Sequence, residues 1–187
     1  SQGSLIEKNI TFDIALRLKN ALTKAGFKAV LTRTKDIDMS AAERAGAANL
    51  AKADLLVSIH TSGSPGVGIY TMDEGDFDSE GAPDRAPLLW DDQNAPYLPD
   101  CLKLAKAVKE SVGRVYEGAD PQVHQARLAG IAGAAMPAIE VEIGSLSDQK
   151  QAEQLADDSF RGRLAVRLEK GIESFARGGE VEPTRKK

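Results

Sequence analysis

The stretch Asp54-Leu55-Leu56-Val57-Ser58-Ile59-His60 decides the fold class of this chain. An apolar run ends in a histidine, and a polar loop that contains glycine follows over residues 61–66. This pattern is typical of a buried parallel strand that delivers one imidazole to the edge of a sheet, where open α/β proteins bind ligands. The chain has only two histidines. His60 is therefore interpreted either as a functional residue or as a hydrogen-bonded histidine at the end of a strand.

The residues before this strand alternate between predicted helix and predicted strand. Apolar residues recur every four positions over residues 6–25, and Gly26 ends this predicted helix. A short strand is predicted over residues 27–33. Ser40 and Glu43 then form a capping-box pattern that opens a second helix. Strand–helix–strand alternation favours an α/β sheet with parallel strands.

The second half of the chain continues this alternation. Its periodicity predicts helices over residues 101–116, 148–156 and 160–175, and strands over residues 66–71, 126–131 and 138–143. We therefore expect one three-layer α/β domain over residues 1–176, with a mostly parallel central sheet of about five or six strands flanked by helices. Residues 177–187 are polar and are predicted to be a disordered tail.

Residues 72–100 interrupt this periodicity. The segment holds nine acidic residues and only one basic residue, Arg85. It is long for a loop in a compact domain, and such loops are usually functional or mobile. We expect an acidic insertion near a cleft, with a regulatory or substrate-contacting role as a lid.

The composition excludes several classes of protein. With 187 residues, the chain can bury one full core. A net charge of −4 argues against nucleic-acid binding. Cys101 is the only cysteine, so no intrachain disulfide can form. No apolar run approaches the roughly 20 residues of a membrane span, and residues 1–4 do not have the features of a signal peptide.

Glu142 lies on a predicted strand that is otherwise apolar. Alternation places Glu140 and Glu142 on the same face, and two carboxylates facing a core would be costly, so this face is expected to line a cleft or solvent. Taken alone, Glu142 is more typical of a solvated edge residue than of a catalyst. Glu7 taken alone is typical of a favourable charge in the first turn of a helix. His124 is interpreted as a surface histidine. Together, however, Glu7, Glu142 and the histidine at the strand end are the residue types of a zinc hydrolase site.

Several segments form an ordered set along the chain. They are Leu5-Ile6-Glu7-Lys8-Asn9, Leu31-Thr32-Arg33 with Asp36 and Glu43-Arg44, Ala53-Asp54-Leu55-Leu56-Val57-Ser58-Ile59-His60, and Met136-Pro137-Ala138-Ile139-Glu140-Val141-Glu142-Ile143-Gly144. In this order the set resembles the zinc-dependent N-acetylmuramoyl-L-alanine amidases, which hydrolyse bacterial peptidoglycan, over about residues 3–175. The resemblance implies that Glu7 and His60 bind Zn²⁺ and that Glu142 is catalytic.

Two positions depart from the family pattern. The family's first zinc ligand is a histidine in a Gly-His-Gly-Gly stretch upstream of the Glu-Lys segment, whereas none of the six residues before Glu7 is a histidine. We interpret the start at Ser1 as a cut end and expect the missing ligand upstream; a degenerate enzyme that lacks the ligand is the alternative. Ser145 stands where the family has an aromatic residue, which is expected to alter the packing under Glu142 or the substrate wall.

The resemblance also implies the reaction and the location. The bond cut would be the amide between N-acetylmuramic acid and the L-alanine of the stem peptide, with peptidoglycan as the partner, in the periplasmic cell envelope or outside the cell. Three alternatives remain at this point. They are a catalytically inactive peptidoglycan-binding domain with an incomplete zinc site, a zinc peptidase on a related scaffold, and a purely structural α/β module.

Overall fold

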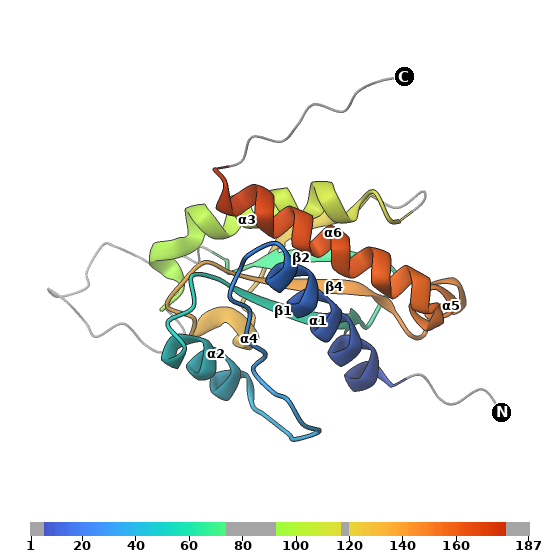
Figure 1. Cartoon of the computed structure of the whole chain (residues 1–187), viewed down its shortest axis with the longest axis horizontal. Helices are drawn as coiled ribbons and strands as arrows, with labels where there is room; N and C mark the ends of the chain where they lie inside the picture. Colours follow the sequence, from blue (N-terminus) through green and yellow to red (C-terminus); the bar gives the residue numbers. More distant parts are fainter. Residues whose placement is uncertain (1–5, 74–92, 117–119, 179–187) are drawn as a thin grey trace, which may run out of the picture.

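The computed structural model describes residues 6–73, 93–116 and 120–178 (Figure 1). Its elements are, in chain order, α1 (Glu7–Lys24), α2 (Ala41–Leu50), β1 (Leu56–Ser62), β2 (Gly68–Thr71), η2 (Ala95–Tyr97), α3 (Leu98–Val112), β3 (Gln122–Gln125), α4 (Ala129–Ala132), β4 (Ala138–Ser145), α5 (Gln149–Ala156) and α6 (Asp158–Ala176). They form one α/β domain, as the sequence predicts.

The four described strands form a single mixed sheet in the order β1-β4-β2-β3. β1 pairs with β4 and β2 with β3 in parallel, whereas β2 and β4 are antiparallel. The expected count of five or six strands is therefore too high for the described residues, and the sheet is less parallel than expected. Only the short loop over residues 63–67 joins β1 to β2. These two strands lie on either side of β4, and a connection of this length is too short for the crossover that parallel strands require, so β2 runs antiparallel to both β1 and β4.

The strand predicted over residues 27–33 is not formed. No described strand pairs with this segment, and Val30 exposes 63% of its surface. Arg33 instead ties the segment to α1: its guanidinium donates a hydrogen bond to the backbone oxygen of Lys8 at 2.9 Å and lies over the ring of Phe12. An apolar extended segment becomes a strand only when a partner supplies its backbone hydrogen bonds.

The strand predicted over residues 126–131 is also wrong. The strand in this region is β3, which ends at Gln125, and residues 129–132 form the short helix α4. Gly130 lets the backbone of α4 lie close to β4, because a Cβ atom at this position would be 3.0 Å from Glu140 Oε2. Contact with the sheet, rather than apolar alternation, determines this segment.

The predicted helix boundaries of α1 and α2 have clear local causes. At the end of α1, Gly26 has a φ of 91°, and the amides of Gly26 and Phe27 donate to the backbone oxygens of Thr23 and Leu22. This is the Schellman arrangement that a glycine favours. At the start of α2, Ser40 and Glu43 form the predicted capping box, with each side chain accepting from the other residue's backbone amide.

Helices α1, α3 and α6 cover one face of the sheet (Figure 1). Their buried residues follow the predicted four-residue spacing and meet the apolar residues of the strands in one core. Its fully buried members include Ile14, Leu104, Val108, Leu164 and Leu168 from the helices and Ile69, Ile139, Val141 and Ile143 from the strands. Burial of this set accounts for most of the hydrophobic stabilisation of the described domain.

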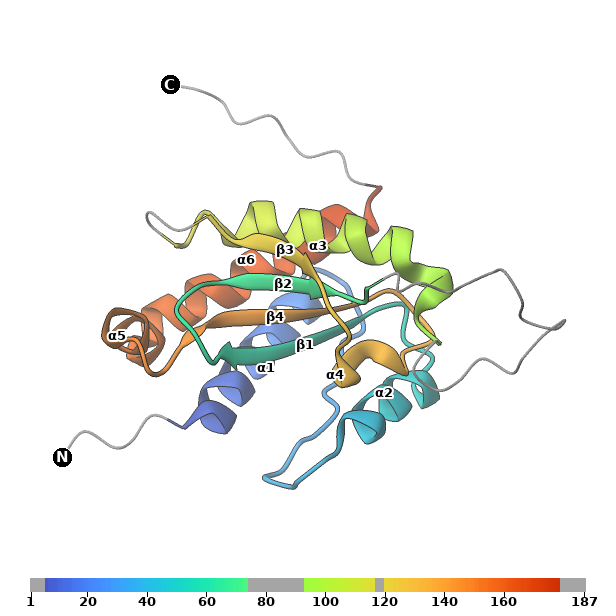
Figure 2. The same cartoon turned by 180° about the vertical axis from the view of Figure 1, so that it is seen from behind.

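Among the described helices, those on the other face of the sheet are α4 and α2, near the start of β1 and β4 (Figure 2). Their smaller core includes Leu56 and Ala138, the first residues of these two strands. Farther along both strands, this face bears polar side chains. The covering helices therefore leave room for a site at the carboxyl end of β1.

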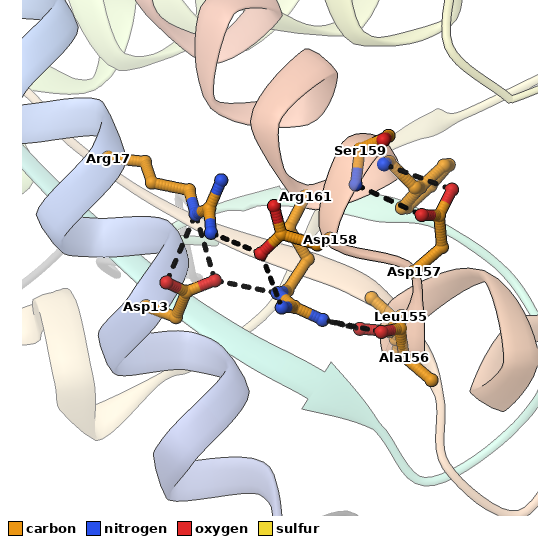
Figure 3. Close-up of polar contacts among 9 residues, drawn as sticks. Asp13, Arg17, Leu155, Ala156, Asp157, Asp158, Ser159 and Arg161 are labelled. Atoms are coloured by element: carbon orange, nitrogen blue, oxygen red, sulfur yellow. Dashed lines mark hydrogen bonds and ion pairs between the residues drawn. The ribbon is translucent and has the colours of Figure 1, made fainter.

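A charged network fixes α6 against α1 (Figure 3). Asp13 accepts hydrogen bonds from Arg161 Nε at 2.6 Å and from Arg17 Nε at 2.9 Å, and Asp158 contacts both arginines. Arg161 also donates to the backbone oxygens of Leu155 and Ala156 at the end of α5. Since Glu7 opens α1, this network helps to fix the helix that carries one predicted zinc ligand.

The acidic segment over residues 72–100 lies largely outside the described residues. Within its described part, residues 95–97 form η2 and α3 already begins at Leu98, three residues earlier than predicted. The proline at residue 99 suits the first turn of a helix, because the missing N–H there has no intrahelical partner. The predicted tail also lies outside the described residues from position 179 onward. Among the helices that the structure describes, none is long and apolar enough to cross a bilayer.

Candidate active site

Strand register assembles the polar side chains of the site. The parallel pairing places Ser58 opposite Glu140 and His60 opposite Glu142, and the antiparallel pairing places Tyr70 opposite Glu140. The alternate residues of the same strands point into the core beneath α1, α3 and α6. Side chains on successive residues of a strand point to opposite faces. These five polar residues therefore share the face that those helices leave open, which we call the polar face.

Glu7 and His60 meet although 53 positions separate them in the chain. Glu7 Oε1 lies 3.3 Å from His60 Nδ1 and accepts a hydrogen bond from the backbone amide of Thr61 at 3.0 Å. Both side chains are a little under half exposed, at 46% and 43%. The first residue of α1 thus reaches the end of β1, where an incoming molecule can contact both side chains.

The second nitrogen of His60 faces the polar face. His60 Nε2 lies 3.1 Å from Ser58 Oγ and 3.7 Å from Glu140 Oε2. Glu140 is far less exposed than Glu7, at 13%. Burial raises the pKa of the Glu140 carboxyl; a charge on His60 would oppose this shift, and the carboxylates of Glu142 and Glu7 reinforce it. His60 is therefore placed between two carboxylates of unlike exposure.

Glu142 has a different partner. The hydroxyl of Tyr70 donates a hydrogen bond to Glu142 Oε2 at 3.0 Å. On its other side, the ring of Tyr70 stacks on His124 of β3, with 4.9 Å between the ring centroids. Burial raises the pKa of the Tyr70 hydroxyl, and its hydrogen bond to Glu142 adds to this rise. Glu142 thus lies opposite His60 in the sheet, and no ion pair joins these two residues in the described structure.

The donor chemistry of Glu7 and His60 suits zinc. A tetrahedral zinc ion with bonds of about 2.0–2.1 Å to a nitrogen and an oxygen keeps these atoms about 3.3 Å apart. The Nδ1 and Oε1 atoms of His60 and Glu7 have this separation, at 3.3 Å. A catalytic zinc needs a third protein ligand. Within residues 6–73, 93–116 and 120–178, no group of three or more His, Cys, Asp or Glu side chains is arranged to hold a metal ion.

The sequence matches the family model of the N-acetylmuramoyl-L-alanine amidases over residues 1–174. This chain belongs to that family. AmiC of Neisseria meningitidis, an N-acetylmuramoyl-L-alanine amidase, is 27% identical to this amidase-family chain over 201 residues, covering 94% of the chain and 48% of AmiC. The sporulation-specific N-acetylmuramoyl-L-alanine amidase of Bacillus subtilis is 29% identical over 173 residues, covering 91% of the chain and 60% of the relative. The chain thus spans about half the length of AmiC.

Solved amidase structures share the fold of this chain. The N-acetylmuramoyl-L-alanine amidase of Clostridium difficile 630 superposes with a TM-score of 0.75 at 23% identity, over 93% of this chain and 86% of the other. The catalytic domain of CwlV from Bacillus (Paenibacillus) polymyxa gives a TM-score of 0.73 at 21% identity, over 95% and 93%. At 21% and 23% sequence identity, the similarity to these two structures shows that the fold is shared.

Three residues of the amidase domain's polar face, Ser58, Tyr70 and Glu140, were not predicted as site residues. The sequence does place Glu140 on the same face as Glu142, but it carries no sign that His60 lies near Glu140. Nothing in the sequence indicates that Tyr70 contacts His124, since their stacking depends on the pairing of β2 with β3. His124 is exposed, as predicted, yet it lies on a strand rather than in a turn.

Ser145 is buried and fully engaged at the end of β4. Its hydroxyl lies 2.7 Å from Ser147 Oγ and accepts from the amide of Ser147, while its own amide donates to Gln151 Oε1. A small polar residue therefore closes this turn of the amidase domain through local hydrogen bonds. A buried hydroxyl is tolerated here because each of its hydrogen-bonding needs is met.

Proposed function

We propose that this chain hydrolyses the amide bond between N-acetylmuramic acid and L-alanine in bacterial peptidoglycan, with zinc held by Glu7 and His60 and with Glu142 as the catalytic base. Membership of the amidase family supports the reaction class. The observation that carries the residue roles is the approach of Glu7 to His60, beside Glu142 in register with His60 on the polar face. Two ligand types that zinc prefers and the carboxylate of Glu142 thus lie near the carboxyl ends of β1 and β4.

The chain's own residues would divide the work as follows. Bound zinc would supply Lewis-acid chemistry, polarising the scissile carbonyl and making water more acidic. Glu142 would accept the proton of the attacking water and pass it to the nitrogen of the leaving L-alanine. Glu7 and His60 would hold the ion, and the amide of Thr61 would keep the Glu7 carboxylate in place. The third protein ligand would come from outside the described residues.

The proposal includes a place of action. An amidase of this family meets its substrate in the cell wall, so we assign this chain to the bacterial cell envelope or to the secreted proteins. Peptidoglycan is its proposed partner.

The catalytic role of Glu142 is tested with Glu142→Gln. This change keeps the size of the side chain and removes its basicity, so we expect turnover to fall by about 10²–10⁴-fold while zinc binding persists. The measurement is release of intact stem peptides that begin with L-alanine from purified sacculi, followed by mass spectrometry. Exposed Glu110→Gln on α3 is the control and should digest sacculi at the native rate. A native rate in Glu142→Gln would contradict the proposal.

One alternative function has a specific observation in its favour. Because the described residues hold only two candidate ligands in contact, the chain could bind peptidoglycan without cleaving it. Sacculus pull-down without product release, at saturating zinc, would support this binding module. A zinc peptidase would instead release fragments cut within the stem peptide, which differ in mass from the whole stem.

A further inference from the structure

Tyr70 reaches Glu142 by an unusual route across the sheet. In the antiparallel pairing of β2 with β4, the residue opposite Tyr70 is Glu140, whereas Glu142 lies opposite Gly68. The Tyr70 side chain therefore leans along its own strand, and its hydroxyl donates to Glu142 Oε2 at 3.0 Å. The contact is a diagonal one, of the kind that only a long side chain can make.

Gly68 makes this path available. A Cβ atom at residue 68 would lie 2.6 Å from Tyr70 Cε2 and 3.1 Å from the Tyr70 hydroxyl oxygen. Real Cβ atoms do not approach other heavy atoms to 2.6 Å, so any side chain at this position would displace the ring. The absence of a side chain at Gly68 is thus tied to the contact between Tyr70 and Glu142.

His124 holds the ring from the opposite side. It lies directly opposite Tyr70 in the parallel pairing of β2 with β3, and the two rings stack with 29° between their planes. Tyr70 is therefore confined by three neighbours: Gly68 beneath the ring, His124 beside it and Glu142 at its hydroxyl. A side chain that is confined by its neighbours can fix the geometry of its hydrogen-bond partner.

We propose that Tyr70 is a positioning residue for Glu142, and that Gly68 and His124 keep it in place. Its hydroxyl occupies Glu142 Oε2 and fixes the carboxylate rotamer, so that Oε1 is the oxygen that faces the reacting water. The benefit is preorganisation, since a base held at the right angle loses less freedom in the transition state. This inference rests on the proposed function, because it concerns the residue assigned there as the base.

The first test removes only the hydroxyl, with Tyr70→Phe in the zinc-loaded protein. Loss of a hydrogen bond to a charged group predicts a fall in kcat of about tenfold or more. We expect KM and zinc affinity to change by less than about twofold, because Tyr70 contacts neither proposed ligand. Tyr116→Phe is the matched control: its hydroxyl donates to the backbone oxygen of Ile143 inside the core, so its loss should lower stability and leave kcat near native.

The second test uses the steric role of Gly68. Gly68→Ala should displace the ring and lower kcat as Tyr70→Phe does. The double variant Gly68→Ala/Tyr70→Phe should be no slower than Tyr70→Phe alone, because the hydroxyl is already gone. Additive losses would mean that Gly68 acts by another route, and would contradict the proposed path.

The third test needs no catalysis. Urea unfolding of the native chain, Tyr70→Phe, Glu142→Ala and the double variant gives a double-mutant cycle. We expect the two sites to be coupled by about fivefold or more in the unfolding equilibrium, and zero coupling would overturn the contact. If Tyr70→Phe keeps the native kcat while Glu142→Gln is inactive, the positioning role of Tyr70 is overturned and the proposed function stands. Native kcat in both variants would overturn the proposed function.

Discussion

His60 has a carboxylate near each of its two ring nitrogens. Glu7 lies at Nδ1, on the exposed side, and Glu140 with Ser58 lies at Nε2, on the polar face. A metal ion can take only one of these nitrogens, and the group at the other nitrogen then orients the ring. The 3.3 Å between His60 Nδ1 and Glu7 Oε1 suits two ligands of one zinc ion, so Nδ1 is favoured as the nitrogen that binds the metal. Glu140 would then hold the ring through Nε2.

Zinc titration of single variants tests this arrangement. His60→Ala and Glu7→Ala should each weaken zinc binding by more than the roughly 10–100-fold that follows loss of a group that only orients a ligand. Glu140→Gln should weaken zinc binding by no more than this roughly 10–100-fold. The measurement is competition with a chromophoric chelator at fixed pH, and His124→Ala, which replaces the only other histidine, is the control. If Glu140→Gln proves the most damaging of the set, the metal lies at Nε2 instead.

Sequence reasoning succeeded for residues whose placement follows from local patterns. One apolar run predicts a strand that ends at His60; β1 continues to Ser62, so His60 lies near its carboxyl end. The place of Glu7 in the first turn of a helix follows from one periodicity. Tyr70 could not be found in this way. Its contact depends on an antiparallel pairing between segments 72 positions apart, and on the missing side chain of Gly68.

At the scale of elements, helices were predicted well and isolated strands poorly. The core faces of α1, α3 and α6 repeat over several turns, so a single misplaced residue does not hide the pattern. A strand of four or five residues depends on its partner. Residues 27–33 have the composition of a strand but no described neighbour, and they remain outside the sheet.

The network between α1 and α6 predicts a pH-dependent stability. Burial alone would raise the pKa of Asp13, but hydrogen bonds from Arg161 and Arg17 outweigh it and hold the pKa below its ordinary value of 3.8. A carboxyl with a lowered folded-state pKa stabilises the protein above its unfolded pKa, and this contribution is lost as pH falls through the folded pKa. Asp13→Asn should therefore lower the free energy of unfolding by about 1 kcal/mol at pH 7 and by less at pH 3.

Urea unfolding at both pH values checks this expectation. Asp36→Asn is the control, because its ion pair with Lys8 is solvent-exposed and should contribute little at either pH. If Asp13→Asn lowers the free energy of unfolding equally at pH 7 and at pH 3, the carboxylate charge is not the source of the stabilisation.

At the scale of the whole molecule, the class of fold follows from the sequence but the open face does not. Strand and helix alternation predicts helices flanking a sheet, and the structure has them. Within the part of the chain that the structure describes, however, the second helical layer consists of α2 and α4 at one end. Its core consists mainly of alanine, methionine and single larger residues, which no periodicity marks. The uncovered part of that face is where the proposed site lies.

Two asparagines hold the segment that leads into β4, and with it Glu140 and Glu142. Asn49 donates to the backbone oxygen of Gly133 and accepts from the amide of Ala135. Asn94 is fully buried: its amide donates to the backbone oxygens of Ala134 and Met136, and its oxygen accepts from Cys101 Sγ. Side chains from two distant parts of the chain thus fix the approach to the strand of the site.

Asn94→Ala should therefore affect both the stability of the whole molecule and the site. It leaves two buried carbonyl oxygens without these donors, so we expect the free energy of unfolding to fall by about 2–3 kcal/mol. Asn20→Ala, at an exposed position of α1, should change it by less than about 0.5 kcal/mol. Urea unfolding gives both values. Hydrogen exchange should show faster opening of residues 129–145 in Asn94→Ala than in the native chain. A loss as small as that of Asn20→Ala would mean that the residues around β4 do not depend on this hydrogen-bonded side chain.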